Sequence, residues 1–234
     1  MRAMILAAGR GERMRPLTDH TPKPLLAVAG KPLIQWHIER LVACGITDIV
    51  INHAWLGHLI EAALADGRSL GANLMYSAEI QPLETAGGIA RALPLLGEAP
   101  FLVINGDIWC DWPLSAAVTI ASRLGHGNAA WLLLVNNPVH HPEGDFYLET
   151  SGHILESPSD PRHVKLTFSG IGVYSPALFT DLPSDQPAPL APLLRQAMAN
   201  RQVIGTHYNG HWVDVGTPQR LAELDQHLSR RLAG

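Results

Sequence analysis

Short apolar runs alternate with amphipathic stretches along the first 136 residues of the chain. The runs that predict buried or half-buried strands are Arg2–Ala7, Asp48–Asn52, Leu74–Ser77, Phe101–Ile104 and Trp131–Val135. Between them, apolar residues recur at helical spacing in Pro32–Gly45, Trp55–Ala65, Gly88–Leu96 and Leu114–Leu124. This alternation is typical of an α/β fold in which a largely parallel sheet carries helices on both faces.

The pattern changes after residue 136, where strand-like segments follow one another more closely. Strands are predicted over Phe146–Glu149, His153–Glu156, Val164–Tyr174 and Gln202–His207, with a helix over Leu190–Asn200 before the last strand. Thr217 is a good N-cap followed by Pro218, which predicts a final helix that ends near Leu232. No linker separates the two parts, so we expect residues 1–234 to form a single Rossmann-like domain, with three α/β/α layers around a predominantly parallel mixed sheet.

Composition narrows the class of protein further. With 47% apolar and 16% charged residues, the chain does not have the composition of a disordered protein. Its longest unbroken apolar run, Ala129–Val135, is far shorter than the ~20 residues that cross a bilayer, and the apolar stretch at the N-terminus is too short for a signal peptide. A net charge of −4 argues against a basic surface for nucleic acid. We therefore expect a cytoplasmic protein, monomeric or homodimeric, with neither a membrane nor nucleic acid as partner.

A glycine-rich stretch follows the first predicted strand. Its candidate nucleotide contacts are Ala8, Gly9, Gly11, Glu12 and Arg13. The stretch lacks the third glycine of the dinucleotide fingerprint and the Gly-Lys-Ser/Thr of the P-loop. Glycines nevertheless let backbone N–H groups approach an anion closely, and Arg10, Arg13 and Arg15 add cationic donors for a polyphosphate. The alternative is an ordinary turn whose arginines face solvent.

Three other residues have the chemistry of a site for anions. Lys23 lies between two prolines whose rings fix their own φ, which pre-positions its charge. Asp107 follows the predicted strand Phe101–Ile104, at the edge where open α/β sheets bind ligands, and Asp214 lies between two valines. A lone aspartate at a strand end is more often a cap or a turn former, so spacing alone does not separate that role from metal binding.

Four motifs, in this order along the chain, resemble those of the sugar-1-phosphate nucleotidyltransferases. They are Leu6–Thr18 with Pro22–Leu25, then Pro82–Ile89, Asn105–Asp107 and Trp212–Pro218. Enzymes of this family join a nucleoside triphosphate to a sugar 1-phosphate and release pyrophosphate. The resemblance covers nearly the whole chain, and it implies a nucleotide-binding half over about residues 1–136 and a sugar-binding half over about residues 137–234.

The resemblance also implies roles for individual residues. Arg13 and Lys23 would be catalytic, and Asp107 and Asp214 fall on the metal-binding aspartates of the family, which implies Mg²⁺ as cofactor. The nucleotide would be bound by Ala8, Gly9, Gly11, Glu12, Arg13, Lys23, Gln81, Thr85 and Gly87, and the sugar phosphate by Asn105, Gly144, Glu156, Lys165 and His140. Asn105 could equally contact the ribose.

The chain departs from the family pattern at Ser157, where many relatives have a lysine that holds the sugar phosphate. Lys165 is a candidate replacement, although a solvated lysine at a strand end is an equal alternative. His140 and His141 lie in a predicted loop, where a structural role is more common than a catalytic one.

Four segments, Asn52–Gly57, Pro82–Ile89, His140–Phe146 and Gly210–Thr217, are most similar to family members that use UTP and N-acetylmuramic acid 1-phosphate in cell-wall recycling. We expect this pair, with His140, His141, Lys165 and Arg162 as candidates for binding the lactyl carboxylate. The alternatives are GTP with mannose or heptose 1-phosphate, and dTTP or UTP with glucose 1-phosphate. A nucleotide-sensing regulatory subunit without turnover is the non-enzyme alternative, although the catalytic set is complete. A dehydrogenase is disfavoured by the missing third glycine.

Overall fold

This computed structural model describes residues 1–125, 127–158, 160, 163–183 and 185–233. The strands are β1 (Ala3–Leu6), β2 (Ala27–Val28), β3 (Lys31–Pro32), β4 (Asp48–His53), β5 (Asn73–Ala78), β6 (Phe101–Asn105), β7 (Ile108–Cys110), β8 (Ala130–Val135), β9 (Phe146–Leu148), β10 (Ile154–Leu155), β11 (Lys165–Tyr174), β12 (Val203–Tyr208) and β13 (Trp212–Asp214). The α-helices are α1 (Leu33–Ala43), α2 (Gly57–Leu64), α3 (Glu84–Leu96), α4 (Ala116–Ala121), α5 (Leu190–Ala199) and α6 (Pro218–Ala233). Over the described residues, none of these helices is both long and apolar enough to cross a membrane.

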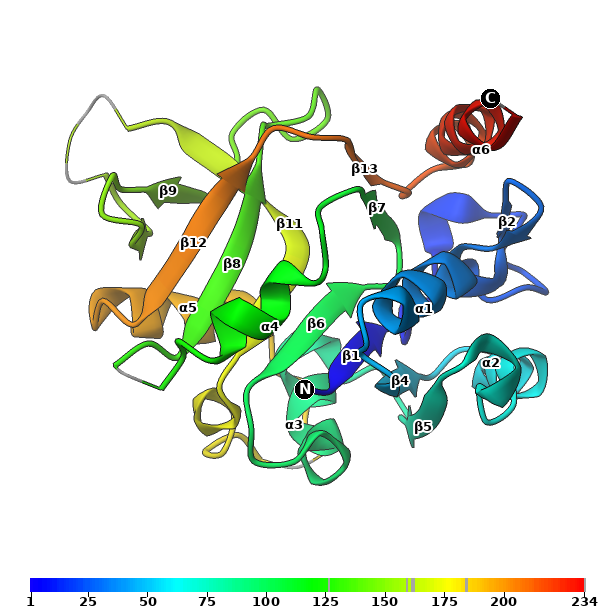
Figure 1. Ribbon diagram of the computed structural model, residues 1–234, viewed down its shortest axis with the longest axis horizontal. Helices are drawn as coiled ribbons and strands as arrows, with labels where there is room; N and C mark the ends of the chain where they lie inside the picture. Colours follow the sequence, from blue (N-terminus) through cyan, green and yellow to red (C-terminus); the bar gives the residue numbers. More distant parts are fainter. Residues whose placement is uncertain (126, 159, 161–162, 184, 234) are drawn as a thin grey trace.

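One sheet extends through both halves of the described chain (Figure 1). Its order is β10-β9-β11-β6-β1-β4-β5, and β8 pairs with both β11 and β12. The strands β6, β1, β4 and β5 are parallel to their neighbours in this series, whereas β11 runs antiparallel to β6 and β8. The α/β class and the mixed sheet predicted from the sequence are therefore confirmed.

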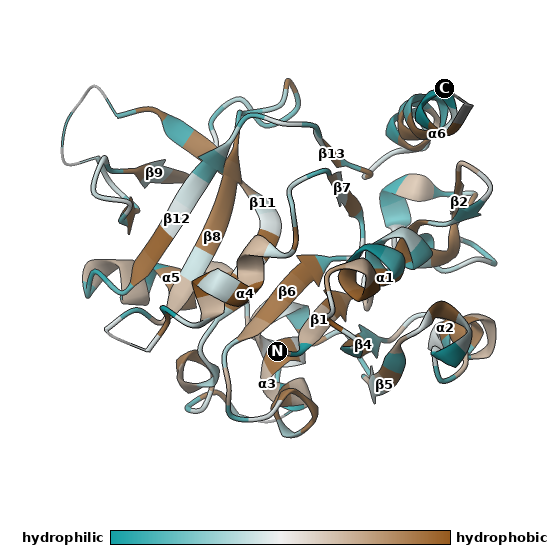
Figure 2. Ribbon diagram, viewed as in Figure 1, coloured by the Kyte–Doolittle hydropathy of each residue, from teal (hydrophilic) through white to brown (hydrophobic). Residues whose placement is uncertain are grey.

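The central strands bury both of their faces, which explains their nearly continuous apolar sequences. On one face, Met4, Val50 and Val103 pack with apolar residues of α3 and α5. On the other face, Ile5 and Ile51 pack with residues of α1, α2 and α4. Figure 2 shows β6 and β8 as mostly hydrophobic, in contrast to the polar surface of α6. The result is the predicted arrangement of a sheet between two helical layers.

The order of the parallel strands creates a crevice between the ends of β1 and β6. From β1 the chain continues to β4 and β5 on one side of β1, and then returns to β6 on the other side. The two connections therefore leave β1 in opposite directions, and ligands bind at such switch points in α/β sheets. The two strand ends are held together by a hydrogen bond, which the Gly106 N–H donates to the Leu6 carbonyl at 2.8 Å. Glycine is needed for this close approach, because a Cβ at position 106 would lie 2.6 Å from the same oxygen.

The structure differs from the predicted elements at α3. The helix begins at Glu84 rather than at Gly88, so Thr85 and Gly87 lie in its first turn and do not precede it. Glycines lower intrinsic helix propensity, which hid this turn in the sequence. Tertiary packing compensates for this low helix propensity, because glycine lets the helix lie close to the segment at Gln186. A Cβ at Gly87 would lie 2.5 Å from the Gln186 carbonyl oxygen. The helix start is thus determined by a chain segment about 100 residues away.

Helix α6 packs against β2 and β13. Its N-terminus is capped as predicted, since the Arg220 N–H donates to Thr217 Oγ1 at 3.3 Å. Leu224 and Leu228 join a small apolar cluster with Val28 and Trp109. These contacts attach the end of the chain to the same side of the molecule as the β1–β6 crevice.

We expect Leu224→Ala to lower the free energy of unfolding by about 2–5 kcal/mol, because the leucine is only 1% exposed and its removal leaves a cavity. Urea unfolding followed by circular dichroism measures the change. Leu232→Ala is the matched control on the same helix, since Leu232 is 65% exposed and its truncation should change stability by less than about 0.5 kcal/mol. Equal effects of the two substitutions would show that α6 is not packed as described.

Candidate active site

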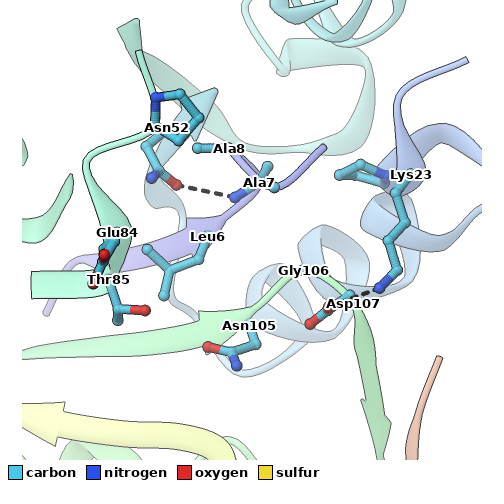
Figure 3. Close-up of a pocket in the computed structure, with 13 residues that line it drawn as sticks. Leu6, Ala7, Ala8, Lys23, Asn52, Glu84, Thr85, Asn105, Gly106 and Asp107 are labelled. Atoms are coloured by element: carbon cyan, nitrogen blue, oxygen red, sulfur yellow. Dashed lines mark hydrogen bonds and ion pairs between the residues drawn. The ribbon is translucent and has the colours of Figure 1, made fainter. Parts of the chain in front are cut away.

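Three adjoining cavities lie along the carboxyl ends of the parallel strands. The first cavity is lined by residues after β1, residues 105–107 after β6, the start of α3, and the side chains of Lys23 and Asn52 (Figure 3). The second cavity extends from Asp107 toward Arg13, His140 and Asp214. The third cavity is lined by the start of α3 and by apolar residues of β9, β11 and α5. Asn105 lines all three, so they form one continuous groove.

Lys23 and Asp107 form an ion pair across the first cavity. Lys23 Nζ lies 2.7 Å from Asp107 Oδ2, and Figure 3 shows the two side chains pointing toward each other. The lysine side chain is only 8% exposed, whereas that of Asp107 is 41% exposed. A buried ammonium requires a partner, because water no longer solvates it. The pair therefore holds a positive charge in the crevice, beside an aspartate that is open to a ligand.

Asp214 reaches the second cavity through the short β7–β13 ladder. In this ladder Asp214 lies opposite Ile108, and the Val215 N–H donates to the Asp107 carbonyl at 2.8 Å. The backbone thus places the two aspartates on adjacent segments, although more than 100 residues separate them in the sequence. Asp214 Oδ2 accepts a hydrogen bond from Arg220 Nη1 at 2.8 Å, and His140 Nε2 lies 3.3 Å from the same oxygen.

The glycine-rich segment contributes residues to both the first and the second cavity. Ala8 and Gly9 line the first cavity, and at Gly9 the space where a Cβ would project is open. Gly11 has a φ of 66°, and a Cβ there would lie 3.2 Å from the Cβ of Lys23, so glycine allows the loop to pack on the lysine. Glu12 begins a 3₁₀ turn, Glu12–Met14, that brings Arg13 to the second cavity.

The groove therefore brings together most of the residues predicted to bind the nucleotide, the sugar phosphate or the metal ion. They are Ala8, Gly9, Arg13, Lys23, Thr85, Asn105, Asp107, His140 and Asp214. Arg10 and Arg15 are placed differently. Arg10 lies over the ring of Trp55 at 5.2 Å, and Arg15 pairs with Asp19 on the surface.

Seven predicted contacts are not among the residues that line the groove, and two of them, Gly11 and Glu12, belong to the glycine-rich segment itself. Gly87 is buried and its N–H donates to the Ala188 carbonyl at 3.1 Å, while Gln81 is exposed beside the first cavity. Glu156 pairs with Arg195 at 3.0 Å on the surface, and Lys165 lies 6.0 Å from the ring of Tyr147. Gly144 forms a turn with a φ of 61°. The next residue, Asp145, lines the third cavity instead.

Four residues at the groove were not predicted from the sequence. Asn52 is the penultimate residue of β4 and lines the first cavity, and the strand-end rule that identified Asp107 would also have found it. Glu84 begins α3 with a φ of 57°, a conformation that a residue with a side chain rarely adopts. Arg220 and Asp145 carry no local signal, because their partners, Asp214 and the Phe168 N–H, come from other elements.

The donor set of the groove fits Mg²⁺. This ion prefers hard oxygen ligands and usually takes one or two carboxylates, with phosphate oxygens and water completing its shell. Asp107 and Asp214 supply two carboxylates, and the ion pairs that each forms with described residues involve Oδ2 and not Oδ1. Among the described residues no group of three or more His, Cys, Asp or Glu side chains is placed to hold a metal ion.

His37 of α1 lies beneath the Asp107–Ile108 segment. It is 1% exposed, and burial lowers the pKa of its imidazole from 6.5 to about 4, with the charge of Arg40 acting in the same direction. Asp107 acts in the opposite direction, although its effect is smaller. The imidazole is therefore neutral at neutral pH, and it supports the β6–β7 segment without adding charge to the groove.

Comparisons with known proteins agree with this geometry. A family model described as "Nucleotidyl transferase" matches residues 2–231. The chain is 55% identical to an N-acetylmuramate alpha-1-phosphate uridylyltransferase of Neisseria meningitidis serogroup B, over 95% of this chain and 96% of the relative. It is 36% identical to a protein of the same name from Caulobacter vibrioides, over 97% of this chain and 96% of that relative.

A solved structure shows the same fold. It is described as a putative glucose-1-phosphate thymidylyltransferase from Bacillus anthracis in complex with a sucrose. The TM-score is 0.82, and the alignment covers 98% of this chain and 95% of that structure at 24% identity.

We expect stability to fall between pH 6.5 and pH 4 because of His37. In this range the unfolded chain binds a proton at the imidazole and the folded chain does not, so the free energy of unfolding decreases as the pH decreases. The shift corresponds to roughly 3 kcal/mol over the whole range. Urea unfolding at several pH values, compared with His37→Leu, isolates this contribution from those of the carboxylates. Identical pH dependence in the two proteins would contradict the assignment.

Proposed function

Because the chain belongs to the nucleotidyl transferase family, we propose that it is an enzyme that transfers a uridylyl group from UTP to N-acetylmuramic acid 1-phosphate. The products are UDP-N-acetylmuramic acid and pyrophosphate, and the reaction is a step of cell-wall recycling in the cytoplasm. The observation that carries the substrate pair is the similarity, over nearly the whole chain, to a relative whose name states these two substrate groups.

The groove supports an arrangement with the nucleotide in the first cavity and the sugar phosphate in the second. The first cavity is formed by the residues after β1, the end of β4 and the start of α3, all within residues 1–136. The second cavity receives His140, Ser169 and Trp212 from residues 137–234. Arg13 and Asp107 line the boundary, where the two anionic substrates must meet. This placement supports the proposed division of the domain into two functional halves.

The proposed reaction is an in-line displacement at the α-phosphorus of UTP. An oxygen of the sugar 1-phosphate forms a bond to this phosphorus while the bond between the α-phosphorus and the bridging oxygen breaks, and that oxygen leaves as part of pyrophosphate. Both reactants are already ionised, so no general base is needed. Positioning and neutralisation of charge then supply the rate enhancement.

Charged residues of the groove would position the two substrates and neutralise the charge of their phosphates. Lys23, fixed by its ion pair with Asp107, stabilises negative charge in the first cavity, and Arg13 does so at the entrance to the second. Asp107 and Asp214 would hold Mg²⁺, which neutralises phosphate charge when bound. Arg220 keeps the Asp214 carboxylate oriented toward the cavity through the hydrogen bond to Oδ2.

The sugar substituents of the proposed substrate suit the groove beyond the phosphates. N-acetylmuramic acid carries a lactyl carboxylate and two methyl groups. His140 and His141 line the second cavity and provide donors for a carboxylate, while Phe146 and Phe168 provide apolar surface in the third. Lys165 lies apart from both cavities, and Arg162 lies outside the described residues. We therefore assign the carboxylate to the histidine loop.

We expect Asp107→Asn and Asp214→Asn to reduce kcat by about 10²-fold or more, because each removes a charged ligand for Mg²⁺. Pyrophosphate release at saturating UTP and Mg²⁺ measures the rate, and circular dichroism checks that both variants fold. Asp19→Asn is the control, since Asp19 pairs with Arg15 on the surface, away from the groove, and its loss should leave kcat unchanged. Nearly full activity in both groove variants would remove the metal assignment.

A substrate matrix tests the proposed function itself. UTP, dTTP, GTP and CTP are each combined with the 1-phosphates of N-acetylmuramic acid, N-acetylglucosamine, glucose, mannose and heptose, and kcat/KM is measured for every pair. We expect the maximum at UTP with N-acetylmuramic acid 1-phosphate, because a site built for a carboxylate is left unpaired by a sugar without one. A maximum at GTP with mannose or heptose 1-phosphate, or at dTTP with glucose 1-phosphate, would overturn the substrate assignment. Absence of turnover with every pair would favour a regulatory subunit.

A further inference from the structure

Asn52 and Glu79 form a buried polar pair at the carboxyl ends of β4 and β5. Asn52 is 2% exposed and Glu79 is 6% exposed. Asn52 Oδ1 accepts a hydrogen bond from the Ala7 N–H at 3.0 Å, which Figure 3 shows, and Asn52 Nδ2 donates to Glu79 Oε1 at 2.7 Å. The pair therefore begins at the backbone of the glycine-rich segment, on one wall of the first cavity.

The second oxygen of Glu79 contacts the segment at the start of α3, which forms another wall of the first cavity. Glu79 Oε2 accepts a hydrogen bond from the Leu83 N–H at 2.9 Å, at the N-terminus of α3. The first N–H groups of a helix have no partner within the helix, and the positive end of the helix dipole favours a carboxylate there. Glu79 thus fixes the start of α3, whose residues Glu84 and Thr85 line the first cavity.

In this chain of hydrogen bonds, the donor and the acceptor of each bond are fixed by the groups at its two ends. The Ala7 N–H can only donate, so it fixes the Asn52 amide with its oxygen toward Ala7 and its nitrogen toward Glu79. The Leu83 N–H also can only donate. Glu79 must therefore accept at both oxygens, which an ionised carboxylate does and an amide cannot do.

Close packing of α3 holds this pair in place. A Cβ at Gly88 would lie 2.7 Å from Glu79 Oε1 and 2.9 Å from Asn52 Nδ2. Glycine at this position lets the helix backbone lie directly against both side chains. Among the described residues the Glu79 carboxylate has two hydrogen-bond donors but no ion-pair partner. Its burial therefore has a desolvation cost, which these two hydrogen bonds offset.

We propose that Asn52 and Glu79 are positioning residues for the nucleotide, an inference that rests on the proposed function. They touch the backbone of both segments that must hold UTP, and they fix the separation between residues 7–9 and residues 82–85. Neither needs to act on the reacting phosphates. Their loss should therefore weaken nucleotide binding much more than it alters the binding of the sugar phosphate.

The single variants Glu79→Gln and Asn52→Asp test the direction of the hydrogen bonds. In Glu79→Gln the new NH₂ group faces another donor, and in Asn52→Asp two carboxylates face each other. We expect each single variant to raise KM for UTP by about 10-fold or more, with KM for N-acetylmuramic acid 1-phosphate changed less than about 3-fold. Isothermal titration calorimetry with UTP gives the affinity independently of turnover.

The double variant Asn52→Asp with Glu79→Gln restores complementarity. The new amide at position 79 donates to the new carboxylate at position 52 and accepts from the Leu83 N–H, while the other oxygen at position 52 accepts from the Ala7 N–H. We expect its KM and Kd for UTP to return to within about 3-fold of the wild-type values. If the single variants fail to fold, recovery of folding and UTP binding in the double variant supports the proposal equally well.

Asp48→Asn is the matched control, because Asp48 accepts from Asn73 Nδ2 at 2.9 Å at the other end of the same two strands, where Asn73 is exposed and Asp48 is only half-buried. It should leave both KM values unchanged. The proposal is overturned if the single variants fold and bind UTP normally, or if the double variant is as defective as the single variants combined. Wild-type protein that binds UTP but turns over no tested sugar phosphate would count against the proposed function, while the calorimetric comparison would still decide the role of this pair.

Discussion

The ion pair between Lys23 and Asp107 is the interaction on which the rest of the groove depends. It connects the loop that follows β1 with the loop that follows β6, and these two strands lie side by side at the point where the strand order reverses. A buried ammonium is stable only with a close partner, so the pair also determines where positive charge is available in the crevice. Two anionic substrates can be brought together only where such charge is already in place.

The groove is assembled from segments that are far apart in the sequence, and each is held by a specific backbone contact. Asp214 is positioned by the β7–β13 ladder, and Arg220 joins it because Thr217 caps α6 directly after that ladder. On the nucleotide side, Asn52 and Glu79 connect the glycine-rich segment to the start of α3. The residues proposed to bind the phosphates are therefore held by the β7–β13 ladder and by the ends of β4 and β5, and not by the loops alone.

Much of this arrangement could be predicted from the sequence. Strands such as Ala3–Leu6 and Phe101–Asn105 are buried on both faces, so their apolar runs are nearly continuous, and Asp107 follows from its place at a strand end. The start of α3 could not be predicted, because Gly87 and Gly88 lower helix propensity and their reason lies in tertiary packing. The position of Arg220 could not be predicted either, because the fold determines that its side chain donates to Asp214. The suggested replacement of the sugar-phosphate lysine by Lys165 has no support from its position, which is against Tyr147.

We propose that Lys23 supplies a positioned positive charge for nucleotidyl transfer, and the substitution Lys23→Arg tests this role. This change keeps the charge but replaces a compact ammonium with a wide planar group that does not fit between Asp107 and the glycine-rich loop. Steady-state pyrophosphate release with UTP and N-acetylmuramic acid 1-phosphate should show kcat lowered by about 10²-fold or more, with KM for UTP raised by a smaller factor. A correctly folded variant that keeps most of its kcat would contradict the account, because Lys23 would then serve only to hold the loop.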